Sequence, residues 1–167
     1  TAWDQPALGG VYKLSALRPG PAAPWRYMLK LSEQPLKVST PGRLQVRRYL
    51  RQGRPVADLL YDLDHVPPAG PRRGRDLAAP ERGLPLELSG CEALDLLQLV
   101  LCEGGRKRPA APLAQARQRA AAGLAAFRPE LRRLRDATPH PVLLEEATAE
   151  LKLQCLRAAQ EQAGRPA

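Results

Sequence analysis

Hydrophobic and polar residues alternate with a period of two along the first part of the chain. The alternation runs over 11–17 and again over 25–31, where Arg26, Met28 and Lys30 face away from the intervening apolar residues. A period of two is that of a strand with one buried face, so both segments are predicted to be strands. The sequence Arg-Pro-Gly-Pro at 18–21 favours a turn between them, because proline fixes φ and glycine allows positive φ.

A second pair of strands is predicted over 44–50 and 56–63. They are joined by Arg-Gln-Gly-Arg at 51–54, where Gly53 is the residue most able to turn the chain, so the pair is predicted to be a hairpin. Residues 66–82 are rich in proline, glycine and arginine with little apolar periodicity, and are predicted to form a mobile loop. The alternation over 84–88 predicts an edge strand, because Pro85 cannot donate to a ladder.

The second half of the chain changes to a helical period. Ser89 and Glu92 match a capping box, which predicts a largely buried helix that ends at Gly104-Gly105. Pro129 is predicted to start a short helix to about Arg135, and the last helix is predicted over 143–159. Apolar residues at spacings of three and four predict another amphipathic helix, with this stripe: Leu113, Ala116, Ala120, Leu124 and Phe127.

These elements predict an α+β fold in which antiparallel β-hairpins are followed by a helical segment. We divide the chain into a β-hairpin region at 1–65, a Pro/Arg-rich loop at 66–83, a helical C-terminal region at 84–160 and a tail at 161–167. No unit of 20 to 50 residues repeats, which excludes a solenoid.

Length and apolar content suit a single unit of a larger soluble protein. The chain has 167 residues, 44% of them hydrophobic, and begins at Thr1 with Met28 as its only methionine, so we expect a natural start further upstream. No stretch reaches the roughly 18 apolar residues of a membrane span, and no signal-peptide pattern opens the chain. We therefore expect a soluble, intracellular polypeptide.

Cys91, Cys102 and Cys155 are an odd number of cysteines at wide spacings, each in an apolar context without a nearby histidine. We predict reduced thiols that are mostly buried in helices, instead of zinc ligands or disulfides, which fits the cytoplasm.

The net charge of +9 admits two interpretations. A polyanion such as nucleic acid would be attracted to it. A GC-rich coding sequence would also produce 21 arginines beside abundant proline, glycine and alanine, and we favour this solvated basic surface.

No set of residues matches a known catalytic or metal-binding motif. Cys-x-x-Cys, His-Glu-x-x-His, Gly-x-Ser-x-Gly and Walker sequences do not occur. His65 and His140 each lie beside or next but one to a proline at an element boundary, with no group placed to orient them, so both are interpreted as surface-loop residues. We therefore assign no catalytic, cofactor-binding or metal-binding residue.

The densest basic cluster lies on and around the second hairpin. It could bind phosphates, with Tyr49 stacking a base, or it could be a charged sheet edge that blocks further pairing, which is the interpretation we favour. The cluster consists of Arg43, Arg47, Arg48, Arg51 and Arg54.

Two stretches carry a resemblance to a known family. Leu-Gly-Gly-Val-Tyr-Lys-Leu at 8–14 and Leu-Lys-Leu-Ser-Glu-Gln-Pro-Leu-Lys-Val-Ser-Thr-Pro-Gly-Arg at 29–43 resemble the segment that follows the barrel in nicotinate phosphoribosyltransferases. The ordered Lys, Ser, Pro, Lys, Pro and Gly positions continue into the hairpin sequence Gly-Arg-Pro-Val-Ala-Asp-Leu-Leu at 53–60. The resemblance weakens in the Pro/Arg-rich loop and returns at 131–135 and 141–144.

The resemblance implies a C-terminal fragment that contributes to the open-faced sandwich domain of a type II phosphoribosyltransferase, without the α/β barrel. It implies a transferase, also classed as a ligase and a glycosyltransferase, that joins nicotinic acid to phosphoribosyl diphosphate. The reaction consumes ATP, uses Mg²⁺ and yields nicotinate mononucleotide for NAD biosynthesis. It further implies a cytoplasmic homodimer, with the barrel and the N-terminal segment as this chain's partners. The family's substrate residues lie upstream of Thr1, so none maps onto a position here.

Two alternatives stay open from the residues alone. One is a nucleic-acid-binding module that uses the hairpin arginines and the basic residues of 72–75, for which salt-sensitive polyanion binding is expected. The other is a catalytically silent scaffold. For the fragment, the isolated chain is expected to be marginally stable, because its sheet should leave an edge or a face uncovered where parts of the parent would pack.

Overall fold

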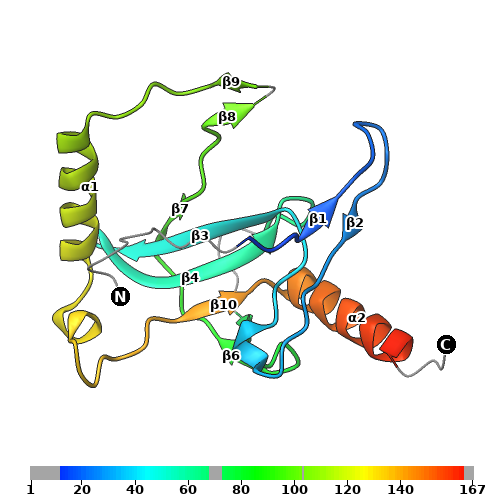
Figure 1. Ribbon diagram of the computed structural model, residues 1–167. Coiled ribbons are helices and arrows are strands. Elements are labelled where there is room, and N and C mark those ends of the chain that lie inside the picture. Colours follow the sequence, from blue (N-terminus) through cyan, green and yellow to red (C-terminus); the bar gives the residue numbers. More distant parts are fainter. Residues whose placement is uncertain (1–11, 68–72, 103, 164–167) are drawn as a thin grey trace, which may run out of the picture.

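The fold is a mixed six-stranded sheet with one helix at each end in the view of Figure 1. The computed structural model describes residues 12–67, 73–102 and 104–163. The strand order in the sheet is β6-β5-β10-β4-β3-β7, and two further two-stranded ladders pair β1 with β2 and β8 with β9. This architecture confirms the α+β class.

The hairpin of β3 (Leu44–Arg51) and β4 (Arg54–Asp62) is the longest ladder in the sheet. It turns at Gln52 and Gly53, which have φ of 51° and 73°, as the turn residues predicted. A register shift between Tyr49 and Leu50 leaves Val56 of β4 as one extra residue close to the turn. The predicted hairpin is confirmed.

Three strands from later in the chain extend the sheet on the β4 side of this hairpin. β10 (Val142–Leu144) pairs parallel with β4 and antiparallel with β5 (Arg73–Asp76), and β6 (Gly83–Pro85) is the edge strand. The edge position of Pro85 confirms that prediction. The loop prediction is wrong for Arg73–Asp76, because β6 and β10 supply backbone partners that local composition does not reveal.

Glycine is required at one point of this packing. Any Cβ at Gly74 in β5 would lie 2.9 Å from the side chain of Leu143 in β10. The glycine that resembled a loop signal therefore allows close approach inside the sheet.

The buried helix predicted to begin after Ser89 is wrong. β7 (Glu92–Asp95) instead pairs antiparallel with β3, and the following Leu96 amide donates to the carbonyl of Val46. The capping box does not form, because Gly90 has a positive φ of 67° and the Ser89 amide donates to its neighbour Glu87. Pairing with β3 outweighs the local helical signal in this segment.

The last helix begins later than predicted and extends further. Leu143 and Leu144 belong to β10, and α2 spans Glu146–Ala163, which takes in part of the tail assigned to 161–167. The Glu145 carboxylate accepts the amide of Thr148 at 2.9 Å, which satisfies one of the free donors at the helix N-terminus. Pairing with β4 and β5 explains why the two leucines lie in a strand.

The helix predicted around Leu113 to Phe127 is confirmed, and the short helix begins at Pro129 as predicted but ends at Arg132 and not at about Arg135. α1 spans Leu113–Ala126, and a 3-10 turn follows at Pro129–Arg132. The packing of α1 differs from the expectation, because none of its residues is buried. β8 (Leu101–Cys102) and β9 (Gly105–Arg106) lie in the connection before α1 and stand away from the six-stranded sheet in Figure 1.

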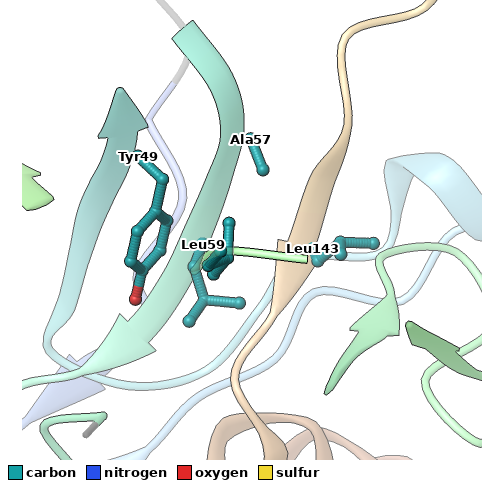
Figure 2. Close-up of a cluster of buried hydrophobic side chains, with 5 residues drawn as sticks. Tyr49, Ala57, Leu59 and Leu143 are labelled. Carbon is teal, nitrogen blue, oxygen red and sulfur yellow. The ribbon is translucent and has the colours of Figure 1, made fainter. Parts of the chain in front are cut away.

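The hydrophobic core lies on the face of the sheet where β3, β4 and β10 meet. Figure 2 shows Tyr49, Ala57, Leu59 and Leu143 on these three strands, and Leu88 from the segment after β6 completes the cluster. All are less than 9% exposed, so this cluster supplies much of the hydrophobic stabilisation of the sheet.

Helix α2 is attached to the rest of the fold by contacts with β4 and with the segment after β5. Lys152 is 2% exposed and donates from Nζ to the carbonyl of Leu77 at 2.8 Å, while the Thr148 hydroxyl accepts the Asp62 amide at 2.9 Å. Burial lowers the pKa of Lys152, against a smaller upward effect from Asp76. These buried polar contacts fix α2 to β4 and to the chain after β5.

The first two predicted strands are mostly extended chain with little pairing. The ladder joins only β1 (Ala16–Leu17) and β2 (Arg26–Tyr27), and Val11 lies outside the described residues. Trp25, Tyr27 and Leu29 are nevertheless half-buried between exposed neighbours, as the alternation predicted. Among the described residues, no helix is long and apolar enough to cross a membrane.

Candidate functional site: the paired arginines of the central hairpin

Arg47 lies in the interior of the sheet in an ion pair with Asp95 of β7. The two residues are directly opposite in the register, and Arg47 donates from Nε to Oδ1 at 2.8 Å and from a terminal nitrogen to Oδ2 at 3.0 Å. The Tyr61 hydroxyl donates to the same Asp95 Oδ2 at 3.0 Å. The result is a closed network that fastens β7 to the hairpin.

This network shifts the titration of its members. The hydrogen bond from Arg47 holds the pKa of Asp95 below its usual value, with a smaller contribution from Tyr61. The pKa of Arg47 is raised mainly by its hydrogen bond to Asp95, and burial raises the pKa of Tyr61. Arg47 and Asp95 are therefore both charged at neutral pH and engaged with each other.

Replacement of Asp95 by asparagine is expected to remove a pH-dependent part of the stability. Because the folded-state pKa of Asp95 lies below its unfolded value of about 4, its contribution is present at neutral pH and is lost as the pH falls through the folded-state pKa. Urea midpoints of D95N and wild type should differ at pH 7 and converge in strong acid. A difference that stays constant with pH would contradict the ion pair's role.

Arg48 points to the other face of the hairpin and pairs with Asp58 of β4. The two are cross-strand partners, with contacts of 2.8 Å from Nε and 2.7 Å from a terminal nitrogen to the two carboxylate oxygens. The Arg48 guanidinium also lies over the ring of Phe127, 4.9 Å from its centroid. This contact links the C-terminal end of α1 to the sheet.

His140 belongs to the same cluster, so its interpretation as a surface-loop residue is wrong. Its side chain is 15% exposed, its Nε2 lies 3.5 Å from Asp58 Oδ2, and its ring meets Phe127 edge to face at 5.2 Å between centroids. His140 is buried because it directly precedes the segment leading into β10, and β10 lies beside β4 inside the sheet. Asp58 is already bound to Arg48 at both oxygens, and the buried Nε2 of His140 makes no hydrogen bond within the described residues, so Asp58 does not orient His140 as a base.

His65 keeps the surface position that was predicted. Its side chain is 49% exposed, and its Nδ1 lies 4.0 Å from Asp62 Oδ1.

The third arginine, Arg43, follows a tight corner built on Asp62. The Asp62 side chain is fully buried; one oxygen accepts the Arg43 amide at 2.6 Å and the other accepts the Asp64 amide at 2.7 Å. Gly42 has φ of +120° and packs against this carboxylate. The Arg43 side chain pairs with Asp64 and lies over Trp25, which connects the N-terminal segment to the hairpin.

Four of the five hairpin arginines therefore bind other parts of the fold: Arg43, Arg47, Arg48 and Arg51. Arg51 donates to the carbonyl of Glu87 at 2.9 Å, and Arg54 is exposed at the turn. The sheet-edge interpretation is wrong, because β3 lies between β4 and β7. The pairing also weighs against a phosphate cradle, since Arg43, Arg47 and Arg48 each face a carboxylate.

The remaining polar groups do not assemble into a metal centre in the part of the chain that the structure describes. A groove of about 420 Å³ lies beside the start of α2 between Arg75, Glu145 and Glu150, but Arg75 is paired there with Glu146. The carboxylates of this groove are thus bound to the fold or open to solvent.

All three cysteines are free and half-buried. Cys155 lies in α2, whereas Cys91 precedes β7 and Cys102 lies in β8, so the prediction that they are mostly buried in helices is wrong for two of them.

Cys155 is expected to react slowly with alkylating reagents. Burial raises the pKa of its thiol, which reduces the thiolate fraction at neutral pH. Iodoacetamide labelling followed by mass spectrometry should modify Cys155 several-fold more slowly in the folded chain than in urea. Equal rates in the two states would contradict its burial.

The chain is similar to known proteins over most of its length. The family model described as "Nicotinate phosphoribosyltransferase C-terminal domain" matches residues 43–152. The human protein named nicotinate phosphoribosyltransferase is 35% identical over 149 residues, which is 87% of this chain and 26% of that protein. A Bacillus subtilis protein of the same name is 48% identical over 52 residues, 31% of this chain and 10% of that protein.

A solved structure agrees with these matches. The crystal structure of human nicotinic acid phosphoribosyltransferase superimposes with a TM-score of 0.60 at 26% identity, covering 79% of this chain and 26% of that one. The chain thus spans about a quarter of the length of the human relative.

Proposed function

Because the chain belongs to the nicotinate phosphoribosyltransferase C-terminal domain family, we propose that it serves as the C-terminal domain of an enzyme that makes nicotinate mononucleotide. The observation that carries the proposal is the extent of the family match. Residues 43–152 run from the start of the hairpin into α2 and include every strand of the six-stranded sheet. The family match therefore covers the whole six-stranded sheet and is not limited to a single motif.

In the proposed reaction, nicotinic acid displaces diphosphate from phosphoribosyl diphosphate, with coupled ATP hydrolysis and Mg²⁺. Such a reaction needs cationic and amide donors that hold the departing diphosphate while charge develops at the ribose carbon. Arg43, Arg47 and Arg48 are paired with carboxylates in this chain, so they are not free to bind diphosphate. We therefore place the diphosphate-binding donors in a barrel outside this chain, for which the longer human relative has room.

The role proposed for this chain is structural. It would pack beside the barrel and the N-terminal segment of the same polypeptide, in a cytoplasmic homodimer that binds neither membranes nor nucleic acid. Exposed leucines support a covering partner: Leu97, Leu99 and Leu101, in the stretch that leads away from β7, are 56%, 63% and 61% exposed.

The isolated chain is expected to bind phosphoribosyl diphosphate no better than it binds inorganic diphosphate. Calorimetry with Mg²⁺ present should give no saturable heat with the isolated chain and a saturable isotherm with the human relative as the control. A micromolar complex with the isolated chain would show that it carries substrate-binding groups of its own.

A further inference from the structure

The positive charge of this protein is concentrated in one segment. Residues 105–135, here called the basic segment, contain nine Lys and Arg residues and a single acid, Glu130, for a net charge of +8 out of the chain's +9. The remaining residues are nearly neutral. A compositional bias toward arginine acts along the whole chain, so it does not explain why the acids are missing from this one segment.

The basic side chains of this segment are exposed and make no salt bridge within the described parts of the chain. By contrast, the arginines of the sheet, such as Arg47, Arg48 and Arg75, are held by carboxylates. The nine residues are Arg106, Lys107, Arg108, Arg117, Arg119, Arg128, Arg132, Arg133 and Arg135.

The basic segment also contains exposed leucines. Leu113 and Leu124 of α1 are 74% and 60% exposed, and Leu134 beyond it is fully exposed. Leu113 and Leu124 lie on the stripe that was predicted to pack inward, yet α1 has no buried residue and lies at the far end of the sheet from α2 (Figure 1). Within the described residues, this segment therefore combines cations that form no ion pair with an apolar stripe on α1 that no other element buries.

The chemistry of this surface selects among polyanions. Single-stranded nucleic acid needs open aromatic rings on which bases stack. The one aromatic residue of the segment, Phe127, is half-buried between His140 and Arg48. A helix that lies on a membrane surface buries a broad face of Trp, Phe or Leu, whereas the apolar positions of α1 are alanines apart from Leu113 and Leu124.

We propose that the basic segment is a docking surface for an acidic polypeptide that carries leucine-like side chains between its carboxylates. The carboxylates would pair with the arginines of α1 and of the turn after it, and the apolar side chains would cover Leu113 and Leu124. This inference does not depend on the proposed enzymatic activity.

The test uses the full chain and a soluble, glutamate-rich copolymer of glutamate and leucine, with binding followed by fluorescence anisotropy. A triple variant R117Q/R119Q/R128Q should bind about tenfold more weakly at low salt, since three exposed ion pairs are lost. The matched variant R26Q/K30Q/R157Q removes three exposed charges elsewhere and should weaken binding about twofold at most. Equal losses in the two variants would overturn the proposal, because binding would then follow net charge alone.

A second comparison tests the apolar part of the surface. The variant L113Q/L124Q should bind the copolymer several-fold more weakly and leave binding of poly-glutamate unchanged. Single-stranded oligonucleotide and vesicles of phosphatidylcholine with phosphatidylserine should bind more weakly than the copolymer. Tighter binding of either one, or no effect of the leucine substitutions, would overturn the proposal.

Discussion

Replacement of Asp62 by alanine is expected to destabilise the chain by about 3–5 kcal/mol, a large part of the stability of a domain of this size. Asp62 is fully buried, and its two oxygens accept the amides of Arg43 and Asp64. Without the carboxylate, these donors lose their partners at the corner where the N-terminal segment meets the hairpin. Urea unfolding monitored by circular dichroism measures the loss.

Two further variants separate the hydrogen bonds from the charge. Asp62→Asn keeps one acceptor oxygen, so its loss should lie between those of wild type and D62A. Glu150→Ala removes an exposed carboxylate from α2 and should change the midpoint little. If D62A unfolds at the same urea concentration as E150A, the corner does not depend on Asp62.

Replacement of Gly42 by alanine is expected to lower the free energy of unfolding by about 4 kcal/mol. The backbone there has φ of +120°, a region that L side chains rarely adopt. A Cβ would also lie 2.5 Å from Asp62 Oδ2 and 3.3 Å from the side chain of Leu44. Strain and overlap therefore add at one position.

Gly53 provides the matched control, because it shares the positive φ without the crowding. Its φ is +73°, and a Cβ there would meet nothing within 4 Å. Gly53→Ala should therefore cost only about 1–2 kcal/mol, the strain of the backbone alone. Equal losses for G42A and G53A in urea unfolding would show that contact with Asp62 does not limit position 42.

Local signals in the sequence were sufficient for elements whose partners lie nearby in the chain. The β3–β4 hairpin follows from alternation and the Gln52-Gly53 turn, and the start of α1 follows from helical spacing after Pro112. In both cases the contacts that specify the element lie within about 20 residues.

The errors occurred where a distant strand decides the conformation. Glu92–Asp95 has a helical pattern, but β3 offers it a ladder and Arg47 pairs with Asp95. Leu143-Leu144 extends because β10 inserts between β4 and β5. The parallel partners of β10 lie more than 80 residues earlier in the chain, so this pairing leaves no local signature in the sequence.

The ion pairs between arginines and aspartates of the sheet were not predicted, for a related reason. The arginines were noted, but their ion pairs with Asp58, Asp64 and Asp95 were not predicted. Aspartate is uncommon in strands, so Asp58 and Asp62 within a predicted strand indicated buried pairing. Their alternation with Leu59 and Tyr61 could have placed them together on the other face of β4, the face to which Arg48 points.

The most direct test of the proposed function compares the isolated chain with the complete polypeptide that contains it. Each is incubated with nicotinic acid, phosphoribosyl diphosphate, ATP and Mg²⁺, and nicotinate mononucleotide is measured by chromatography. The complete polypeptide should form the product, and the isolated chain, folded as judged by circular dichroism, should form none. Product from the isolated chain, or none from the complete polypeptide, would contradict the assignment of this chain as the structural C-terminal domain of such an enzyme.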